Sequence, residues 1–249
     1  MHVALFVTCL IDNMRPQVAH ASIALLQQAG CTVDVPLQQT CCGQPAYNNG
    51  DMADARALAR HTITVLEAYD HIVIPSGSCG GMIIHHYPRL FADEPAWLSR
   101  AQTLASRCHE LTQFLHDILH FTPTSQCQHS LTYHDSCSSR REMGITTQPR
   151  ALLKQIQGLE LKEMNETEVC CGFGGTFSIT YGDISAQMST NKAGNVQASG
   201  AELLAAGDLG CLLNIAGRLS RKGSPVRVFH IAEVLAGMTD APAIGEGEG

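Results

Sequence analysis

Cysteine is the residue type in this sequence whose number and spacing best suit chemistry. The chain has 249 residues and eleven cysteines, eight of which fall into two sets. Each set has a single cysteine, a Cys-Cys-Gly motif just over thirty residues later, and another single cysteine. The first set is Cys9, Cys41, Cys42 and Cys79, and the second is Cys137, Cys170, Cys171 and Cys211. Because converging thiolates repel one another unless a cation neutralises them, each set predicts a bound metal ion or iron–sulfur cluster.

The two sets indicate that the chain is an internal duplication. Corresponding cysteines are separated by 128, 129, 129 and 132 residues, and so steady an offset is typical of a repeat. The spacing divides the chain into a first domain over residues 1–122 and a second over residues 123–240. Residues 241–249 are small and acidic, and we expect them to form a disordered tail.

Hydrophobic patterning predicts strands that alternate with helices in both repeats. The expected strands cover residues 2–8, 32–35, 71–75, 130–136, 159–164, 202–206 and 226–229. The expected helices cover residues 16–28, 51–69, 148–157 and 183–198. This order predicts an α/β fold of two pseudo-repeated βαβ-type domains with parallel sheets. Since ligands of such sheets lie beyond the carboxyl ends of the strands, each cysteine set should converge at one edge of its own sheet.

The residues around the cysteines favour iron–sulfur clusters over zinc. Gly43 and Gly172 follow the cysteine pairs, where glycine allows a tight turn and lets backbone amides approach sulfur. Structural zinc sites usually contain Cys-x2-Cys, and neither set does, because Met82 and Asn214 stand three residues after the last cysteines. Zinc and a metal-free redox dithiol remain as alternatives at this stage.

Other candidate residues receive simpler interpretations. We expect Cys31, Cys108 and Cys127 to be buried thiols that act as small hydrophobic side chains. His134 lies three residues before Cys137 and could be a ligand or a proton donor beside a cluster. Strand alternation would place the two on opposite faces, which favours a structural or supporting role for the histidine.

Composition excludes several classes of function. A net charge of −7 and an aromatic content of 5% argue against a nucleic-acid binder, which needs a basic face and stacking platforms. No apolar run approaches the length of a transmembrane helix, so we expect a cytoplasmic protein without direct membrane insertion. The sequence also lacks a Gly-x-Gly-x-x-Gly dinucleotide motif and a P-loop. A chain with metal sites and no hydride-accepting cofactor is expected to pass electrons for another protein.

The pattern of each set, Cys-x31/32-Cys-Cys-Gly-x35/38-Cys, resembles the cysteine-rich CCG domain family. That family includes the B subunit of heterodisulfide reductase and iron–sulfur subunits of glycolate and glycerol-3-phosphate oxidation. The resemblance implies that each set of four cysteines binds one iron–sulfur cluster. Heterodisulfide reductase has a further cysteine where this chain has Met82 and Asn214, so four ligands per site imply an ordinary [4Fe–4S] cluster.

The resemblance is greatest to short family members that consist of two such domains and act in lactate oxidation. It implies an electron-transfer subunit of a complex that oxidises L-lactate to pyruvate, without activity on its own. It also implies two partner subunits, one of which carries ferredoxin-like clusters. A stand-alone thiol or heterodisulfide reductase-like enzyme and a zinc-binding structural protein are the alternatives.

Overall fold

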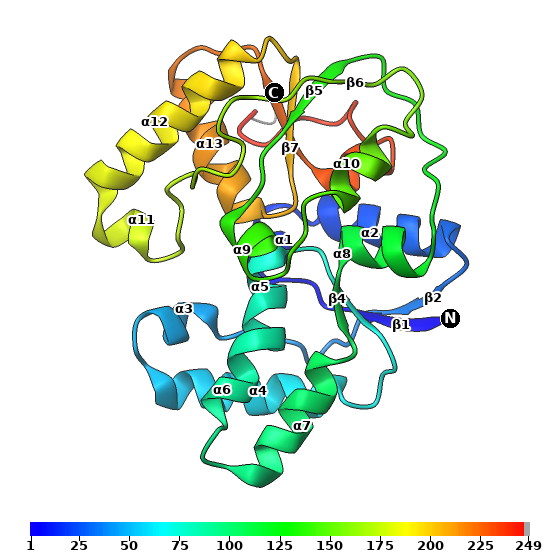
Figure 1. Cartoon of the computed structure of the whole chain (residues 1–249), viewed down its shortest axis with the longest axis vertical. Helices are drawn as coiled ribbons and strands as arrows, with labels where there is room; N and C mark the ends of the chain where they lie inside the picture. The colour runs from blue at the N-terminus through cyan, green and yellow to red at the C-terminus, as the bar shows by residue number, and fades with distance from the viewer. Residues whose placement is uncertain (247–249) are drawn as a thin grey trace.

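The structure is a computed structural model that describes residues 1–246. Within these residues the strands form two all-parallel sheets, as predicted, and each sheet has four strands (Figure 1). The first sheet has the order β2-β1-β3-β4 and the second has the order β6-β5-β7-β8, which is the same order shifted by one repeat. The strands are β1 (His2–Leu5), β2 (Thr32–Asp34), β3 (Ile72–Ile74), β4 (Cys108–Glu110), β5 (Ser130–Tyr133), β6 (Glu160–Leu161), β7 (Leu203–Ala206) and β8 (Arg227–His230).

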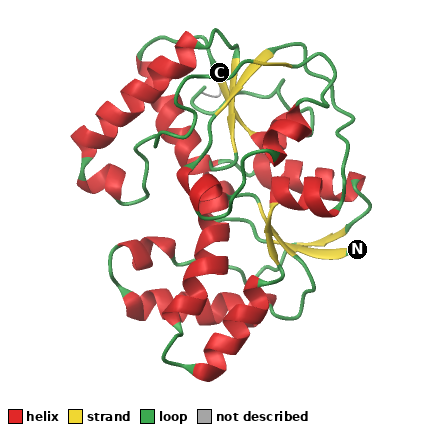
Figure 2. Cartoon of the chain, in the orientation of Figure 1, coloured by secondary structure: helices red, strands yellow, loops and turns green. Residues whose placement is uncertain are grey.

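Helices follow most strands and cover the faces of both sheets (Figure 2). In the first repeat they are α1 (Cys9–Met14), α2 (Gln17–Gln28), α3 (Gln44–Asn48), α4 (Met52–Leu66), α5 (Gly77–Gly81), α6 (Tyr87–Leu90), α7 (Pro95–Ala105) and α8 (Leu111–Gln113). A π-helical turn over Met82–His86 joins α5 to α6, and another over Phe114–Ile118 extends α8. In the second repeat they are α9 (Cys137–Arg141), α10 (Gln148–Leu153), α11 (Phe177–Thr180), α12 (Gly182–Ala198), α13 (Leu209–Arg221) and α14 (Ile231–Leu235).

The two repeats share one hydrophobic core. Helix α2 of the first repeat packs against α14 of the second, and one buried cluster contains side chains of β1, α2, β7 and α14. At the same boundary Arg15 Nη2 lies 2.8 Å from Glu233 Oε1, whose side chain is fully buried. A buried carboxylate is costly unless it is paired, so this contact satisfies the charge of Glu233 and ties the repeats together.

Equivalent backbone bonds show that the repeats superimpose residue by residue at the end of their first strands. Phe6 N–H donates to Val73 O at 2.9 Å, and His134 N–H donates to Ala205 O at 2.9 Å. Val73 and Ala205 occupy the same place in the two sheets, since β1 pairs with β3 and β5 pairs with β7. Phe6 and His134 are therefore structural counterparts.

The expected elements are present, with shorter ends, and several others were not anticipated. Strand β4 and helices α5, α7 and α13 were not predicted. Helix α4 begins where expected because the side chain of Asp51 accepts a hydrogen bond from Asp54 N at 3.1 Å. Among residues 1–246, no helix combines the length and apolar character needed to cross a bilayer.

The prediction of a disordered tail is wrong for residues 241–246. Ala243 and Ile244 are buried, and Ile244 N–H donates to Val228 O at 2.8 Å beside β8. Burial of these two apolar side chains outweighs the acidic character of the segment. Residues 247–249 lie outside the described residues.

Candidate metal centres

The eight cysteines lie where the strands of each sheet end, as the fold predicted. Cys9, Cys79, Cys137 and Cys211 fall in the first turns of α1, α5, α9 and α13, which follow β1, β3, β5 and β7. The Cys-Cys pairs lie in loops, the first directly before α3 and the second between β6 and α11. The single cysteines are thus helical, although the sequence indicated loops. The N-terminal end of a helix carries partial positive charge that favours a thiolate.

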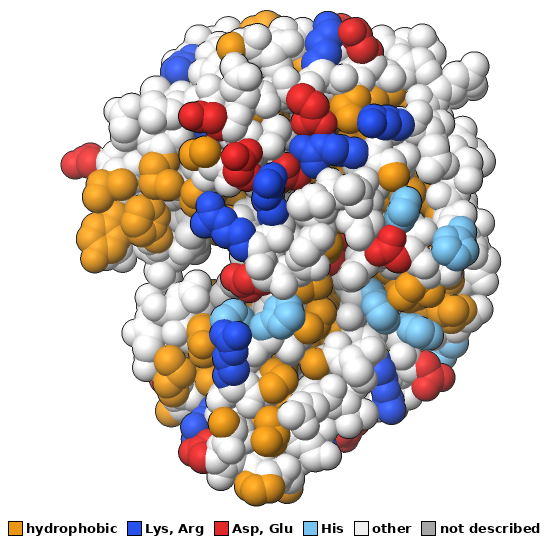
Figure 3. Space-filling model, viewed as in Figure 1, with side chains coloured by type: hydrophobic (Ala, Val, Ile, Leu, Met, Phe, Trp, Pro, Cys, Tyr) orange, Lys and Arg blue, Asp and Glu red, His pale blue; other side chains and the backbone are white. Residues whose placement is uncertain are grey.

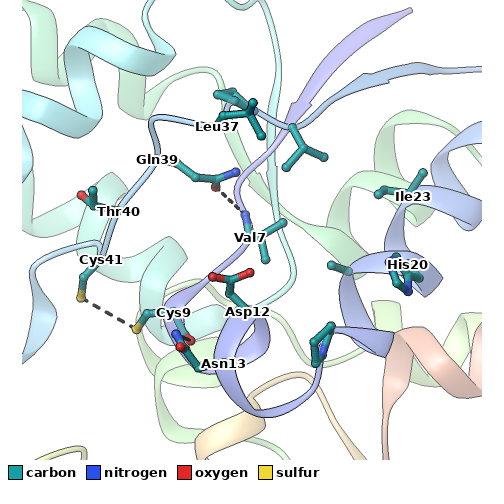
Figure 4. Close-up of a pocket in the computed structure, with 14 residues that line it drawn as sticks. Val7, Cys9, Asp12, Asn13, His20, Ile23, Leu37, Gln39, Thr40 and Cys41 are labelled. Atoms are coloured by element: carbon teal, nitrogen blue, oxygen red, sulfur yellow. Dashed lines mark hydrogen bonds between the residues drawn. The ribbon is translucent and has the colours of Figure 1, made fainter.

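The first set brings its four sulfur atoms together in two contacts. Cys9 Sγ lies 3.9 Å from Cys41 Sγ, and Cys42 Sγ lies 3.3 Å from Cys79 Sγ. Figure 4 shows the Cys9–Cys41 contact at the wall of a cavity of about 490 Å³. Cys42 is buried, whereas the other three are half-buried. The first set therefore has a buried side and a side that faces the cavity.

The second set repeats this arrangement and adds a histidine. Cys171 and Cys211 are buried, and their sulfur atoms and a ring nitrogen of His134 all lie within 4.8 Å of one another. Cys137 and Cys170 are half-buried, like their counterparts in the first set. All eight cysteines proposed from the sequence as ligands therefore lie in the expected two groups.

The glycines after the cysteine pairs shape both loops. Gly43 has φ 84° and Gly172 has φ 87°, a left-handed conformation that glycine adopts without steric cost. This turn aims Gly43 N–H at Cys41 Sγ, at 3.5 Å, and Gly172 N–H at Cys170 Sγ, at 3.4 Å. Amides directed at sulfur stabilise a thiolate or a metal-bound sulfur. The structure therefore supports the role that the sequence suggested for these two residues.

Shared hydrogen bonds lower the pKa of the first cysteine of each Cys-Cys pair and raise the pKa of its neighbours. Hydrogen bonds from the thiols of Cys42 and Cys9 lower the pKa of Cys41. Hydrogen bonds from the thiols of Cys137 and Cys171 likewise lower the pKa of Cys170. The cysteines that share protons with these two have raised pKa values, chiefly because of the same hydrogen bonds and burial. In the second set the pKa of Cys211 is also lowered, to about 7, chiefly by its hydrogen bond with Cys171. Four thiolates could coexist in either set only with a cation that replaces the shared protons.

The donor sets fit a metal ion or an iron–sulfur cluster. Each offers four cysteine sulfurs and a glycine amide, and the soft thiolate is the ligand that zinc, copper(I) and iron–sulfur clusters prefer. Sulfurs around one tetrahedral ion with bonds of about 2.3 Å would lie roughly 3.8 Å apart, close to the 3.9 Å and 3.3 Å contacts of the first set. The distances between the cysteine sulfurs therefore permit a zinc ion as well as an iron–sulfur cluster.

A buried carboxylate links the two sets. Asp208, just before α13, accepts hydrogen bonds from Ser76 Oγ at 2.7 Å, Ser78 N at 3.1 Å and Ser78 Oγ at 2.9 Å. It also accepts hydrogen bonds from Ser136 and Ser139 in the second repeat. These serines flank Cys79 and Cys137, so the network joins the N-terminal ends of α5 and α9 (Figure 1). The two sets are therefore neighbours within one molecule.

The three remaining cysteines belong to neither set. Cys31 and Cys127 are buried in the shared core, and Cys108 lies within β4 in the core of the first repeat. Burial raises the pKa of all three thiols, so each stays protonated.

The surroundings of the second set include His134, for which the sequence favoured a structural or supporting role, and Lys192, which sequence reasoning missed. His134 was expected to point away from Cys137, but the strand ends at Tyr133, so strand alternation does not apply to it. Lys192 is 1% exposed, and its Nζ donates to Glu166 O and Thr167 O close to Cys171. The one sequence signal that could have identified Lys192 is a lysine on the buried face of a helix, where charged residues are rare.

Asn214 and Met82, which replace the further cysteine of heterodisulfide reductase, have different roles. Asn214 Nδ2 donates to Cys171 O at 2.9 Å and so braces the second cysteine loop. Met82 is fully buried in the core of the first repeat, where Tyr87 OH instead donates to Cys42 O at 2.8 Å. Each cysteine-pair carbonyl is therefore satisfied by a residue from beyond the set.

Comparison with known proteins assigns the class. A family model described as a cysteine-rich domain, CCG, matches residues 3–84 and again residues 131–216. Among solved structures, a hypothetical protein from Helicobacter pylori aligns with 96% of this chain and 49% of its own, with a TM-score of 0.70 and 12% sequence identity. The chain thus spans about half the length of that protein, and at this identity the likeness concerns the fold alone.

Similar sequences narrow the family further. Proteins named Lactate utilization protein A are 45% identical in Halalkalibacterium halodurans, 47% in Shouchella clausii and 46% in Geobacillus kaustophilus. Each alignment covers 94% of this chain, and 96%, 98% and 98% of the respective relatives. The chain belongs to the CCG cysteine-rich domain family and, within it, to the family of lactate utilization protein A.

Proposed function

We propose that this protein is an iron–sulfur electron-transfer subunit that acts in lactate utilisation. The observation that carries the proposal is the convergence of two complete cysteine sets in a chain that aligns end to end with lactate utilization protein A. Cys9, Cys41, Cys42 and Cys79 would hold one [4Fe–4S] cluster. Cys137, Cys170, Cys171 and Cys211 would hold the other.

The proposed reaction is oxidation of L-lactate to pyruvate by a complex of which this chain is one part. An iron–sulfur cluster supplies reversible one-electron transfer when bound, so two clusters match the two electrons released from lactate. The chain's own residues hold the two sets next to each other through the Asp208 network and exclude water from Cys42 and Cys171. The sequence has no dinucleotide-binding motif for accepting a hydride, so we infer that lactate itself reacts on a partner.

We propose two partner subunits, one with ferredoxin-like clusters. Exposed apolar side chains on α11 and the start of α12 offer a docking surface near the second set (Figure 3). Ile179, Tyr181 and Ile184 are 84%, 54% and 55% exposed on this tip. Large contiguous exposed apolar patches mark interaction sites, so we propose this tip as a contact surface for one of the partner subunits.

Anaerobic purification followed by iron, acid-labile sulfide and zinc analysis tests the cofactor. We expect brown protein with iron and labile sulfide in both sets. Stoichiometric zinc without sulfide would refute the proposal and favour the zinc-binding alternative, which the 3.3–3.9 Å sulfur contacts permit.

Genetic complementation tests the substrate. A strain that lacks this gene and other lactate dehydrogenases should fail to grow on L-lactate and recover with the wild-type gene. Glycolate and glycerol serve as controls, since other members of the family act on glycolate and glycerol 3-phosphate. Normal growth on lactate together with failure on glycolate would overturn the lactate assignment and leave the iron–sulfur assignment standing. Disulfide reduction by the isolated chain would favour the stand-alone enzyme.

A further inference from the structure

His134 is held in the tautomer that suits a metal ligand. Its Nδ1 lies 3.2 Å from Thr167 O, and because a carbonyl can only accept, the proton is on Nδ1. Nε2 of the neutral ring then carries a free lone pair. The side chain is fully buried, and Nε2 has no hydrogen-bond partner among residues 1–246. A buried nitrogen without a partner is costly and calls for an explanation.

The free nitrogen belongs to the second cysteine set. A ring nitrogen of His134 and the sulfur atoms of Cys171 and Cys211 lie within 4.8 Å of one another. Nδ1 is already bonded to Thr167 O, which leaves Nε2 as the available ligand atom. Imidazole suits both iron and zinc.

Neighbouring residues fix the orientation of the ring. Thr167 O also accepts from Asp135 N at 3.2 Å and from Lys192 Nζ at 3.4 Å. Lys192 binds Glu166 O as well, and Glu166 has a left-handed φ of 54°, which is rare for a residue other than glycine. Histidines that bind metals usually donate their second ring N–H to a backbone carbonyl or carboxylate, as His134 does.

The first set lacks a counterpart. The structurally equivalent residue is Phe6, which is also fully buried and whose N–H makes the same inter-strand bond. Phenylalanine offers no donor atom, so the duplication alone does not account for a histidine at this place.

We propose that His134 Nε2 is a fifth protein ligand of the metal group in the second set, beside the sulfurs of Cys171 and Cys211. The inference rests on the proposed function, because it assumes that iron occupies this set. Nε2 would bind one iron through its lone pair, next to that iron's cysteine sulfur, and no proton would have to leave, since Nδ1 keeps its hydrogen. The second set then binds its group with four sulfurs and one nitrogen, and the first set binds with four sulfurs.

Nitrogen hyperfine spectroscopy tests the proposal directly. The full chain is labelled with ¹⁵N-histidine, purified without oxygen, reduced, and measured by pulsed electron paramagnetic resonance. We expect a ¹⁵N coupling typical of a directly coordinated nitrogen. The coupling should vanish in His134→Phe, which copies the residue of the first set. His116→Gln, a change at a half-exposed histidine, should keep it.

The outcomes separate the two hypotheses. Absence of iron and sulfide from the wild-type protein overturns the proposed function and this inference together. Iron in both sets without a coordinated-nitrogen coupling, or a coupling that persists in His134→Phe, overturns this inference alone. If His134→Phe fails to fold, His134→Gln supplies the same test, because a glutamine amide nitrogen has no lone pair available for iron. Circular dichroism on each variant establishes that it is folded.

Discussion

The two cysteine sets have the same loop conformation but differ in the residues that surround them. Both have a left-handed glycine whose amide faces a sulfur, and both place half of their cysteines in the first turn of a helix. Around the second set, however, His134 and Lys192 stand where the first set has Phe6 and Thr62. The last pair corresponds because Gly43 packs against Ala55 and Leu58 as Gly172 packs against Ser185 and Met188.

This difference shows what each part of the motif constrains. Cysteines and glycines are dictated by metal binding, so they recur at the same positions. Four cysteines can hold a metal without help from the residues around them, so one site could acquire a histidine and a lysine while the other kept Phe6 and Thr62. Two sites with the same cysteine pattern can thereby differ in reduction potential, which depends on nearby hydrogen bonds and charge.

The helix caps beyond the fourth strands differ in a second way. Glu110, the last residue of β4, caps α8 by accepting from Thr112 N at 2.8 Å, and His230, the last residue of β8, caps α14 by accepting from Ala232 N at 3.2 Å. Both are buried. Burial raises the pKa of Glu110 to about 7 and lowers the pKa of His230 to about 4. Equivalent positions thus respond to pH in opposite directions.

Loss of one buried cysteine should produce the largest difference between the two cysteine sets. Cys42→Ala should remove the metal from the first set only, and Cys171→Ala from the second only. Each change deletes one thiolate of a site whose metal can contribute on the order of 10 kcal/mol. Iron and sulfide analysis of each variant measures the effect, with Cys108→Ala as the control that keeps full iron. Loss of iron from both sets in either variant would contradict independent sites.

The contributions of Glu110 and His230 to stability should change with pH in opposite directions. For Glu110, the folded pKa of about 7 lies above the ordinary value of 4.5, so its contribution to stability falls as pH rises from 4.5 to 7. For His230, the folded pKa of about 4 lies below the ordinary 6.5, so its contribution rises between pH 4 and 6.5. Each amounts to roughly 3 kcal/mol over its full range.

Single substitutions should reveal how each residue changes the slope of the free energy of unfolding against pH. Relative to wild type, Glu110→Gln should make the free energy of unfolding rise more steeply between pH 4.5 and 6.5. His230→Gln should make it rise less, or fall. Urea unfolding at several pH values measures both. Slopes that change in the same direction in the two variants would show that these caps are not the titrating groups.

Much of this architecture could be predicted from the sequence, because repeats and hydrophobic patterns are local signals. The cysteine offsets located both sites, and the alternation of strand and helix located most of the sheet. Strand β4 was missed because Cys108–Glu110 is three residues long and contains a histidine and a glutamate, which gives no apolar run. The orientation of the His134 ring could not be predicted, because it depends on the strand ending at Tyr133 and on the position of Thr167 O, which the sequence does not encode locally.

Replacing the glycine after each cysteine pair with alanine should lower the stability of the protein by different amounts. A Cβ at Gly172 would lie 2.8 Å from Ser185 O and 2.9 Å from Met188 Cβ, whereas a Cβ at Gly43 would meet Leu58 Cβ at 3.4 Å. Both changes strain a left-handed residue, by about 1 kcal/mol. Gly172→Ala adds a clash with backbone and should cost about 2–3 kcal/mol in total. Thermal unfolding of both variants measures the difference, and equal losses would refute the packing argument.

The smallest expected effect concerns the charge beside the second set. Lys192 Nζ is buried close to Cys171, and its counterpart Thr62 carries no charge. Removing a positive charge makes a nearby group harder to reduce, so Lys192→Met should lower the potential of the second cluster by on the order of 50 mV, about 1 kcal/mol for one electron. Thr62→Val, the matched change at the first set, should leave both potentials unchanged. Redox titration followed by electron paramagnetic resonance resolves the two clusters. A shift confined to the first cluster, or equal shifts in both, would show that Lys192 does not distinguish the sites.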